Sequence, residues 1–229
     1  MPIVRGNKIL LGAAIGAIAG VLVSLVRVPL PSLPVFESDH VLLGHRPLLL
    51  ACVAMWAIFG VYWDAAGKKT APTKTSETRG SRAIHVALAN IALLLEIAPI
   101  RGLGRFLPAS VIIMGAGLAV EFAGLFLAIW ARRHLGQYWS GEISIKVKHE
   151  LIRSGPYGTL RHPIYTGLLL MYAGVAAVTG EWLALIGLGM AVFAYVRKIR
   201  LEELNLNSAF GLEYDAYRRA TWALVPGIF

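Results

Sequence analysis

The sequence predicts an all-α fold, a polytopic membrane bundle of about six transmembrane helices, and three observations support this class. Hydrophobic residues make up 57% of the 229 positions and charged residues only 15%, against roughly 45–50% and about 25% in soluble domains. The apolar residues form long uncharged blocks. The net charge of +9 lies in short loops between those blocks, which membrane orientation explains better than nucleic-acid binding. A soluble globule and a disordered chain are both excluded.

Six blocks are long enough, or nearly so, to cross a hydrocarbon core that needs about 20 residues. The first has basic residues before it, but Arg27-Val28-Pro29 follows in place of a small-residue cleavage site, so we expect a retained anchor. The last is short, and its helix is expected to continue beyond the membrane through Arg197–Leu206. The predicted spans are Ile9–Val26, Pro47–Trp63, Ala83–Ile100, Leu107–Ala131, Pro163–Thr179 and Trp182–Val196.

The loop charges predict how these spans are oriented. With six alternating helices and a cytoplasmic N-terminus, 18 of the 22 Lys and Arg residues lie on the inner side. Such an excess is typical of cytoplasmic loops. We therefore expect an integral membrane protein with both termini in the cytoplasm.

The two halves of the chain differ in how much polar information they carry. Residues 1–106 hold the first three helices, where Gly12, Gly16 and Gly20 favour close packing of the first helix. The polar loop at 68–82 is expected to be a flexible connector without chemistry. Residues 107–229 hold helices four to six, the loop 132–162 and the segment 197–229. Cys52 is the single cysteine, which makes an internal disulfide impossible and argues against a thiolate metal site.

The first polar cluster is the loop 132–162, which is long for a connection between two membrane helices; such loops are often functional. Alternating apolar residues at 143, 145 and 147 indicate a short strand-like stretch. Arg161-His162-Pro163 opens helix five, and Pro at a first helical turn loses no backbone donor. The free N–H groups of this helix start favour an anionic ligand group.

The second polar cluster follows helix six. If that helix continues, Arg200, Glu203 and Asn207 share one face, while Lys198 and Glu202 share another. Adjacent carboxylates at 202 and 203 point about 100° apart, so only one readily faces a given site. A tight turn at 179–181 makes helices five and six antiparallel neighbours. We therefore expect the two clusters to meet at the cytoplasmic surface.

A pocket built from these clusters has a definite chemical character. It offers Arg and helix N–H groups to a carboxylate, Glu to an ammonium group, and Tyr and Trp faces to a cation or an aromatic ring. That combination suits a zwitterionic, cationic, nucleoside-bearing cofactor such as S-adenosylmethionine. It equally suits a phosphorylated amphiphile, so the residues predict a ligand site and leave the ligand open.

Five short motifs occur in order between about Trp130 and Phe229: LGQYWS, GPYGTLRHPIYTG, RLEEL, FGLEYDAYRR and VPGIF. Together they resemble the isoprenylcysteine carboxyl methyltransferase family, integral-membrane enzymes that use S-adenosylmethionine and are related to the phospholipid methyltransferases. The resemblance implies a cytoplasm-facing cofactor pocket. It also implies that a prenylated substrate enters sideways from the lipid.

The resemblance assigns roles residue by residue. It places Arg200, Glu202 and Glu203 near the transferred methyl group and the substrate carboxylate, as catalytic candidates. It matches Tyr214 and Tyr217 to an aromatic pair that closes the pocket on the substrate; an interfacial aromatic belt is the alternative. The cofactor-binding candidates are His149, Leu151, Gly155, Tyr157, Arg161, His162, Tyr165, Glu202 and Glu203.

Glu96 and Glu121 are ionisable residues inside predicted spans, so each should face protein or water. Glu121 lies mid-helix beside the predicted site and is a substrate-cavity candidate, with a buried structural hydrogen bond as the alternative. Glu96 is expected to be structural. His134, His149 and His162 are separated by 15 and 13 residues, which matches no compact ligand motif, so no metal is expected.

The residues and the resemblance together predict a membrane methyltransferase that moves the methyl group of S-adenosylmethionine to a lipophilic acceptor. The favoured acceptor is the carboxylate of a prenylated cysteine or a similar isoprenoid amphiphile, which is already ionised and needs no general base. Phospholipid amine N-methylation is an alternative that would need a base such as Glu203. A non-catalytic lipid-binding or transport protein is another. The expected partners are this lipophilic substrate and membrane lipid, with no nucleic acid and no metal.

Overall fold

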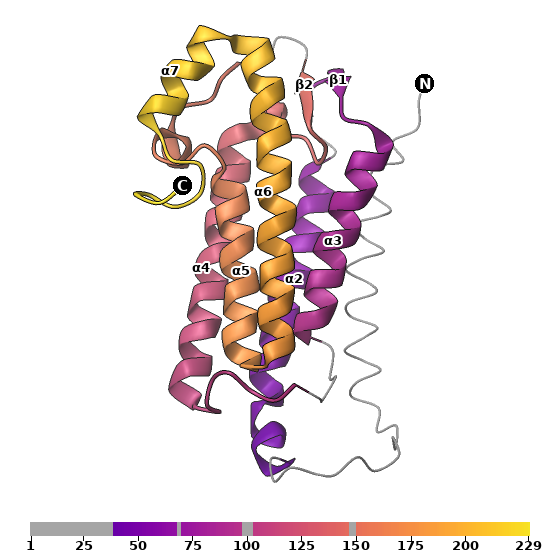
Figure 1. The fold of residues 1–229 in the computed structure, drawn as a ribbon, viewed down its shortest axis with the longest axis vertical. Helices are drawn as coiled ribbons and strands as arrows, with labels where there is room; N and C mark the ends of the chain where they lie inside the picture. The colour runs from indigo at the N-terminus through magenta and orange to yellow at the C-terminus, as the bar shows by residue number, and fades with distance from the viewer. Residues whose placement is uncertain (1–38, 68–69, 98–102, 147–149) are drawn as a thin grey trace.

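The computed structural model describes residues 39–67, 70–97, 103–146 and 150–229 and shows a mostly helical bundle (Figure 1). The first predicted span, Ile9–Val26, lies outside these residues. The elements are α2 (Asp39–Gly67), β1 (Thr73–Ser76), α3 (Arg79–Ile97), α4 (Val111–Leu135), the 3-10 turn η1 (Gly136–Tyr138), β2 (Ser144–Lys146), the 3-10 turn η2 (Gly155–Gly158), α5 (Pro163–Thr179), α6 (Trp182–Phe210) and α7 (Leu212–Ala220).

Apolar helices long enough to cross a membrane confirm an integral membrane protein. Within the described residues, four helices meet that length and composition: α2 from Pro47, α3, α4 and α6. Helix α5 is a shorter apolar helix of 17 residues. The cytoplasmic placement of the termini remains a prediction, as does the division at residues 106 and 107.

Helix boundaries agree with the predicted spans where sequence punctuation is strong. Helix α5 begins and ends at the predicted residues, because Pro163 opens it and Gly180 follows it. Helix α6 continues to Phe210, beyond the end of the predicted span at Val196. Helix α3 begins four residues before its predicted span and α4 ends four residues after its own, because apolar blocks mark the lipid-facing part while a helix also runs through charged residues at its ends. Helix α4 begins at Val111, later than the predicted Leu107.

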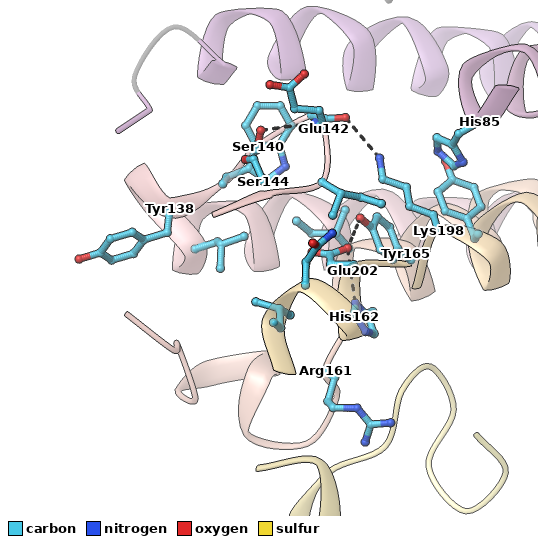
Figure 2. Close-up of a pocket in the computed structure, with 18 of the residues that line it drawn as sticks. His85, Tyr138, Ser140, Glu142, Ser144, Arg161, His162, Tyr165, Lys198 and Glu202 are labelled. Atoms are coloured by element: carbon cyan, nitrogen blue, oxygen red, sulfur yellow. Dashed lines mark hydrogen bonds and ion pairs between the residues drawn. The ribbon is translucent and has the colours of Figure 1, made fainter. Parts of the chain in front are cut away.

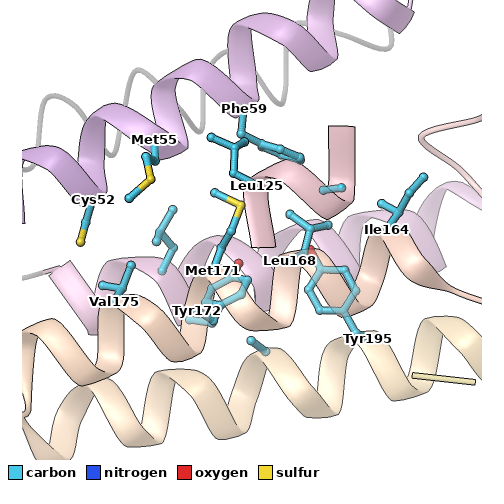
Figure 3. Close-up of a cluster of buried hydrophobic side chains, with 14 of the residues drawn as sticks. Cys52, Met55, Phe59, Leu125, Ile164, Leu168, Met171, Tyr172, Val175 and Tyr195 are labelled. Atoms are coloured by element: carbon cyan, nitrogen blue, oxygen red, sulfur yellow. The ribbon is translucent and has the colours of Figure 1, made fainter. Parts of the chain in front are cut away.

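A hydrophobic core joins α2, α4, α5 and α6 (Figure 3). Cys52 of α2, Met171 and Tyr172 of α5, and Tyr195 of α6 are all buried in it. The Tyr172 hydroxyl donates a hydrogen bond of 2.8 Å to the Ala89 carbonyl of α3, which satisfies a polar group that would otherwise be buried without a partner. The core therefore also fixes α3 to the rest of the bundle.

Small residues bring pairs of helices into backbone contact. A Cβ added to Gly117 of α4 would lie 2.8 Å from the Gly174 carbonyl oxygen of α5 and 2.9 Å from the Ala177 Cβ. On the other side of the bundle, a Cβ added to Gly187 of α6 would lie 2.6 Å from the Ala92 carbonyl oxygen of α3. Because membrane helices associate largely through such packing, α4–α5 and α3–α6 are the tight pairs of this fold.

The turn between α5 and α6 determines which residues of α6 lie level with the start of α5 at the opposite end of the bundle. Gly180 adopts φ +63°, the left-handed region that glycine enters without strain, and its carbonyl accepts a 2.9 Å hydrogen bond from the Phe106 N–H. The 17 residues of α5 then rise about 24 Å from the turn. An equal climb along α6 reaches about residue 198, so the residues after it lie beside the start of α5.

The expectation of an all-α fold needs one correction. Strands β1 and β2 form a small antiparallel sheet, with Thr73 opposite Lys146 and Ser76 opposite Ser144. The sheet lies at the same end of the bundle as η2, α7 and residues 221–229, which we call the polar end (Figure 1). Part of the loop 68–82, expected to be a flexible connector, is thus ordered by pairing with the strand-like stretch, and Glu77 accepts a 3.1 Å hydrogen bond from the Ile143 N–H.

The α4–α5 contact yields a matched pair of variants on one helix. We expect Gly117→Ala to lower stability by about 1–3 kcal/mol, because the new methyl group meets backbone and rigid side chains. Gly115→Ala, two residues away, has nothing within 4 Å of the added Cβ and should be neutral or stabilising, since Ala is the better helix former. Thermal unfolding in detergent measures both. Equal stability of the two variants would contradict the close packing.

Candidate functional site

A cavity of about 180 Å³ lies at the polar end and is lined by two kinds of wall (Figure 2). One wall is polar and comes from the loop after α4, the start of α5, the extension of α6 and helix α7. The other is largely apolar and comes from α2, α3 and the middle of α5. The lining includes Phe59, Trp63, His85, Asn90, Trp139, Leu151, Tyr157, Arg161, His162, Tyr165, Leu168, Tyr195, Lys198, Glu202, Tyr214 and Tyr217.

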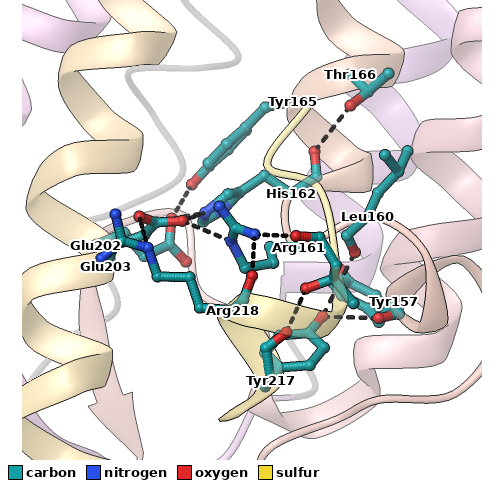
Figure 4. A network of polar contacts seen from close by, with 11 residues as sticks. Tyr157, Leu160, Arg161, His162, Tyr165, Thr166, Glu202, Glu203, Tyr217 and Arg218 are labelled. Carbon is teal, nitrogen blue, oxygen red and sulfur yellow. Dashed lines mark hydrogen bonds and ion pairs between the residues drawn. The ribbon is translucent and has the colours of Figure 1, made fainter. Parts of the chain in front are cut away.

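The start of α5 and the extension of α6 meet through charged side chains. Arg161 Nε lies 2.8 Å from Glu203 Oε1, and His162 Nε2 lies 3.4 Å from the same oxygen (Figure 4). Arg218 of α7 approaches the other Glu203 oxygen at 3.7 Å. The two Arg161–Glu203 side chains are only 10% and 15% exposed, so this pair is screened by water much less than a surface salt bridge.

Arg161 also holds the segment that follows α7. Its guanidinium donates to the Arg218 carbonyl at 3.0 Å and to the Thr221 carbonyl. The Arg161 and His162 backbone N–H groups donate to the Trp222 and Ala223 carbonyls at 2.7 and 3.1 Å. The carbonyls of residues 222–223 therefore accept hydrogen bonds from the two N–H groups just before α5. These two donors, which lie nearest the predicted anion site, are thus already bonded within the protein.

Glu202, one residue from Glu203, turns toward the cavity. It accepts a 2.6 Å hydrogen bond from the Tyr165 hydroxyl, and the Tyr165 ring stacks on His162 with centroids 5.5 Å apart and planes at 10°. Neighbouring helical residues point about 100° apart, which explains why Tyr165 bonds Glu202 and Arg161 bonds Glu203, although His162 lies within 4 Å of both carboxylates. Glu203 fastens the polar end, whereas Glu202 lines the cavity.

Three tyrosines close the cavity beside α7. The Tyr217 hydroxyl donates to the Tyr157 carbonyl at 2.7 Å, while the buried Tyr214 hydroxyl has no hydrogen-bond partner among the described residues. Burial raises the pKa of Tyr157 and Tyr214 well above the ordinary value, and that of Tyr217 to about 12. All three phenols therefore stay protonated at neutral pH and can donate hydrogen bonds.

The structure brings most of the sequence-predicted residues to one place. His149 lies outside the described residues. Gly155 does not line the cavity; it is the first residue of η2, has a φ of +58° and packs against the His134 ring. The residues that line the cavity are Leu151, Tyr157, Arg161, His162, Tyr165, Glu202, Tyr214 and Tyr217.

Arg200 and Glu121 are the predicted residues that the structure places elsewhere. Arg200 is exposed and does not line the cavity, because the face of α6 turned inward is the one that carries Lys198 and Glu202. Glu121 is fully buried in α4, and neither of its oxygens has a hydrogen-bond partner among the described residues. It does not line the cavity either. The catalytic role of Arg200 and the substrate role of Glu121 remain predictions.

Sequence reasoning missed the wall formed by α2 and α3. Phe59 and Trp63 of α2 and His85 and Asn90 of α3 line the cavity, although the first three helices showed no signature. Their residue types fit any membrane helix, so pattern alone could not single them out. Lys198 was also missed, and its spacing of four residues from Glu202 was the available signal.

Long apolar helices with a cavity at one end define an integral membrane protein with a candidate ligand site. Residues 112–213 match the family model described as phospholipid methyltransferase. Residues 112–213 are thus similar to membrane methyltransferases, and two curated relatives that match part of this chain are named protein-S-isoprenylcysteine O-methyltransferases. The matched region contains α4 to α6 and thus the charged part of the cavity.

Curated relatives match parts of the chain. The protein-S-isoprenylcysteine O-methyltransferase of Dictyostelium discoideum is 31% identical over 35% of this chain and 34% of that protein. The cobalt-zinc-cadmium resistance protein CzcN of Cupriavidus metallidurans is 37% identical over 48% of this chain and 49% of that protein. The chain thus spans about a third to a half of these relatives. The solved structure of a eukaryotic intramembrane Ras methyltransferase, isoprenylcysteine carboxyl methyltransferase, aligns at 15% identity and TM-score 0.47 over 99% of both chains.

We expect Glu203→Gln to destabilise the protein by about 1–3 kcal/mol, because it removes a charged partner from the part-buried Arg161. The matched control is Glu213→Gln, whose ion pair with Arg153 is 44% and 58% exposed and should contribute less than about 1 kcal/mol. Thermal unfolding in detergent compares the two variants. If they unfold at the same temperature, the Arg161–Glu203 pair does not fasten the polar end.

Proposed function

We propose that this protein is a membrane methyltransferase that transfers the methyl group of S-adenosylmethionine to the carboxylate of a prenylated cysteine or a similar isoprenoid amphiphile. The observation that carries the proposal is that one cavity has both a charged, tyrosine-rich wall and an apolar wall formed by the apolar helices. Apart from Tyr214 and Tyr217 of α7, the charged wall lies in the region that matches membrane methyltransferases. An amphiphile and a polar cofactor need these two surfaces side by side.

The residues of the charged wall fit S-adenosylmethionine chemically. Glu202 faces the cavity with one oxygen engaged by Tyr165, which leaves acceptor capacity for an ammonium group or ribose hydroxyls. The unpartnered Tyr214 hydroxyl offers a donor, and the Tyr157, Tyr165 and Tyr217 rings suit a sulfonium cation or an adenine ring. Leu151 and His162 complete the proposed cofactor set within the cavity, and Gly155, Glu203 and His149 remain proposed from the sequence.

The bound cofactor supplies an electrophilic methyl group; the chain supplies alignment and charge placement. Holding two reactants in line is worth up to about 7–11 kcal/mol. Glu202 would bind the cationic cofactor. Arg161 and His162 hold the extension of α6, which carries Glu202, against the start of α5. The buried tyrosines exclude water, which strengthens these electrostatic interactions. A carboxylate acceptor is already ionised at neutral pH, so no residue has to remove a proton from it.

A second candidate, methylation of a phospholipid amine, is favoured by the description of the matching family model. An amine acceptor is protonated at neutral pH and must lose that proton before it attacks a methyl group. Glu202 faces the cavity, so it would be the base, and not Glu203 as the sequence suggested. The cavity contains the same residues in both cases, which makes the pH dependence the discriminating property.

The direct test is transfer of radiolabel from S-adenosylmethionine to N-acetyl-S-farnesylcysteine by the purified protein in detergent. We expect transfer, and we expect Glu202→Gln to lower kcat/KM at least tenfold, because the amide keeps the shape but removes the charge that binds a cation. Glu213→Gln, an exposed carboxylate variant, should keep full activity.

Absence of labelled product with every prenyl or phospholipid acceptor would overturn the proposal in favour of a non-catalytic lipid-binding protein. Equal activity of Glu202→Gln and wild type would remove Glu202 from the cofactor site. Arg200→Ala belongs in the same series, because unchanged turnover would remove Arg200 from the mechanism.

The pH profile separates the two acceptors. A carboxylate with a pKa of about 3.3–3.7 stays ionised between about pH 6 and 8, so kcat/KM should be flat in that range. An amine acceptor would give a rate that rises up to about tenfold per pH unit below its own pKa. Initial rates at saturating S-adenosylmethionine measure this dependence, and a steep rise with the farnesylcysteine acceptor would contradict the base-free mechanism.

A further inference from the structure

Lys198 is a buried cation whose role the preceding mechanism does not use. Three Lys or Arg side chains line the cavity in the described part of the chain: Arg82, Arg161 and Lys198. Arg82 pairs with Glu142 at 2.9 Å and Arg161 with Glu203 at 2.8 Å. Lys198 is 8% exposed, and no carboxylate among the described residues lies within 4 Å of it.

The immediate contacts of the ammonium group leave it incompletely satisfied. Lys198 Nζ donates to the Gly141 carbonyl at 3.3 Å and lies 5.7 Å from the Tyr165 ring centroid. An ammonium group carries three donors, so further hydrogen-bonding capacity remains. Glu202, Glu77 and Glu142 attract Lys198 only from beyond ion-pair distance. Burying a cation in this way is costly unless another group completes its surroundings.

Lys198 lies where the two walls of the cavity join (Figure 2). It is one helical turn before Glu202, about 6 Å further toward the middle of the bundle. His85 and Asn90 of α3 and Tyr195 of α6 line the cavity on that side, and Phe59 and Leu168 supply apolar surface. An anionic group at Lys198 would therefore have the charged wall on one side and room for an apolar tail on the other.

We propose that Lys198 binds the anionic headgroup, a carboxylate or a phosphate, of a lipophilic ligand and so determines which amphiphiles occupy the cavity. Only the statement that this ligand is the methyl acceptor rests on the proposed function. Lys198 is a specificity residue of the acceptor end, distinct from the Glu202 side that faces the cofactor. A bound anion supplies the partner that the ammonium group lacks.

The test measures binding and needs no methyl transfer. Quenching of tryptophan fluorescence in the full-length protein in detergent compares N-acetyl-S-farnesylcysteine, its uncharged methyl ester and farnesyl phosphate. We expect the wild type to bind at least one of the two anions tenfold or more tightly than the ester. The preferred anion shows whether the natural headgroup is a carboxylate or a phosphate.

Variants assign this preference to Lys198. Lys198→Met should reduce the preference to less than twofold and leave the affinity for S-adenosylhomocysteine unchanged within twofold, while Lys198→Arg should retain the preference. Lys74→Met, an exposed lysine of β1, is the control for net charge and should behave as wild type. Because the acid–ester comparison in the wild type requires no variant, equal binding of acid and ester would overturn the proposal even if Lys198→Met did not fold.

Equal binding of both anions and the ester by the wild type would overturn the proposal. A preference that survives in Lys198→Met would do the same, as would loss of S-adenosylhomocysteine binding in that variant with the anion preference intact. If the anion preference depends on Lys198 but no acceptor is methylated, the proposed function fails and the ligand site stands.

Discussion

The ion pair between Arg161 and Glu203 is the contact on which the polar end depends. It joins the segment just before α5 to the extension of α6, and the same guanidinium donates to the Arg218 and Thr221 carbonyls. Arginine suits this position because its planar fork presents several donors in fixed directions, whereas a lysine would present a single flexible ammonium group. One side chain thus fixes three segments that lie far apart in the sequence.

The adjacent residues Glu202 and Glu203 have two different roles on one helix, one toward the cavity and one in holding its wall. Glu203 is committed to Arg161, His162 and Arg218, and Glu202 is presented to the cavity by Tyr165. A helix extended beyond the membrane span makes this division possible, because each step along it turns the side chain by about 100°. The cavity can therefore keep a carboxylate available without losing the one that holds its wall.

Sequence reasoning predicted the parts of this structure that local chemistry determines. The bounds of α5 followed from Pro163 and the turn at Gly180, and the antiparallel turn placed His162 beside Glu203. The rotation of α6 about its axis could not be predicted, because it depends on the packing of Gly187 against α3; this rotation turns Lys198 inward and Arg200 outward. Strand β1 was missed because four polar residues form a strand only when a partner completes their hydrogen bonds. The wall from α2 and α3 was missed because apolar residues look alike whether they face lipid, core or ligand.

The glycine contacts of α4–α5 and α3–α6 have a mechanical consequence. Two helices whose backbones touch cannot separate or slide without losing close contacts along their length. We therefore treat each pair, α4–α5 and α3–α6, as a rigid unit and call it a leaf. The leaves are joined at the α5–α6 turn, which lies at the end of the bundle away from the cavity. At the cavity end the Arg161–Glu203 ion pair joins the same two leaves, so anything that passed between the leaves there would have to break this ion pair but neither glycine contact.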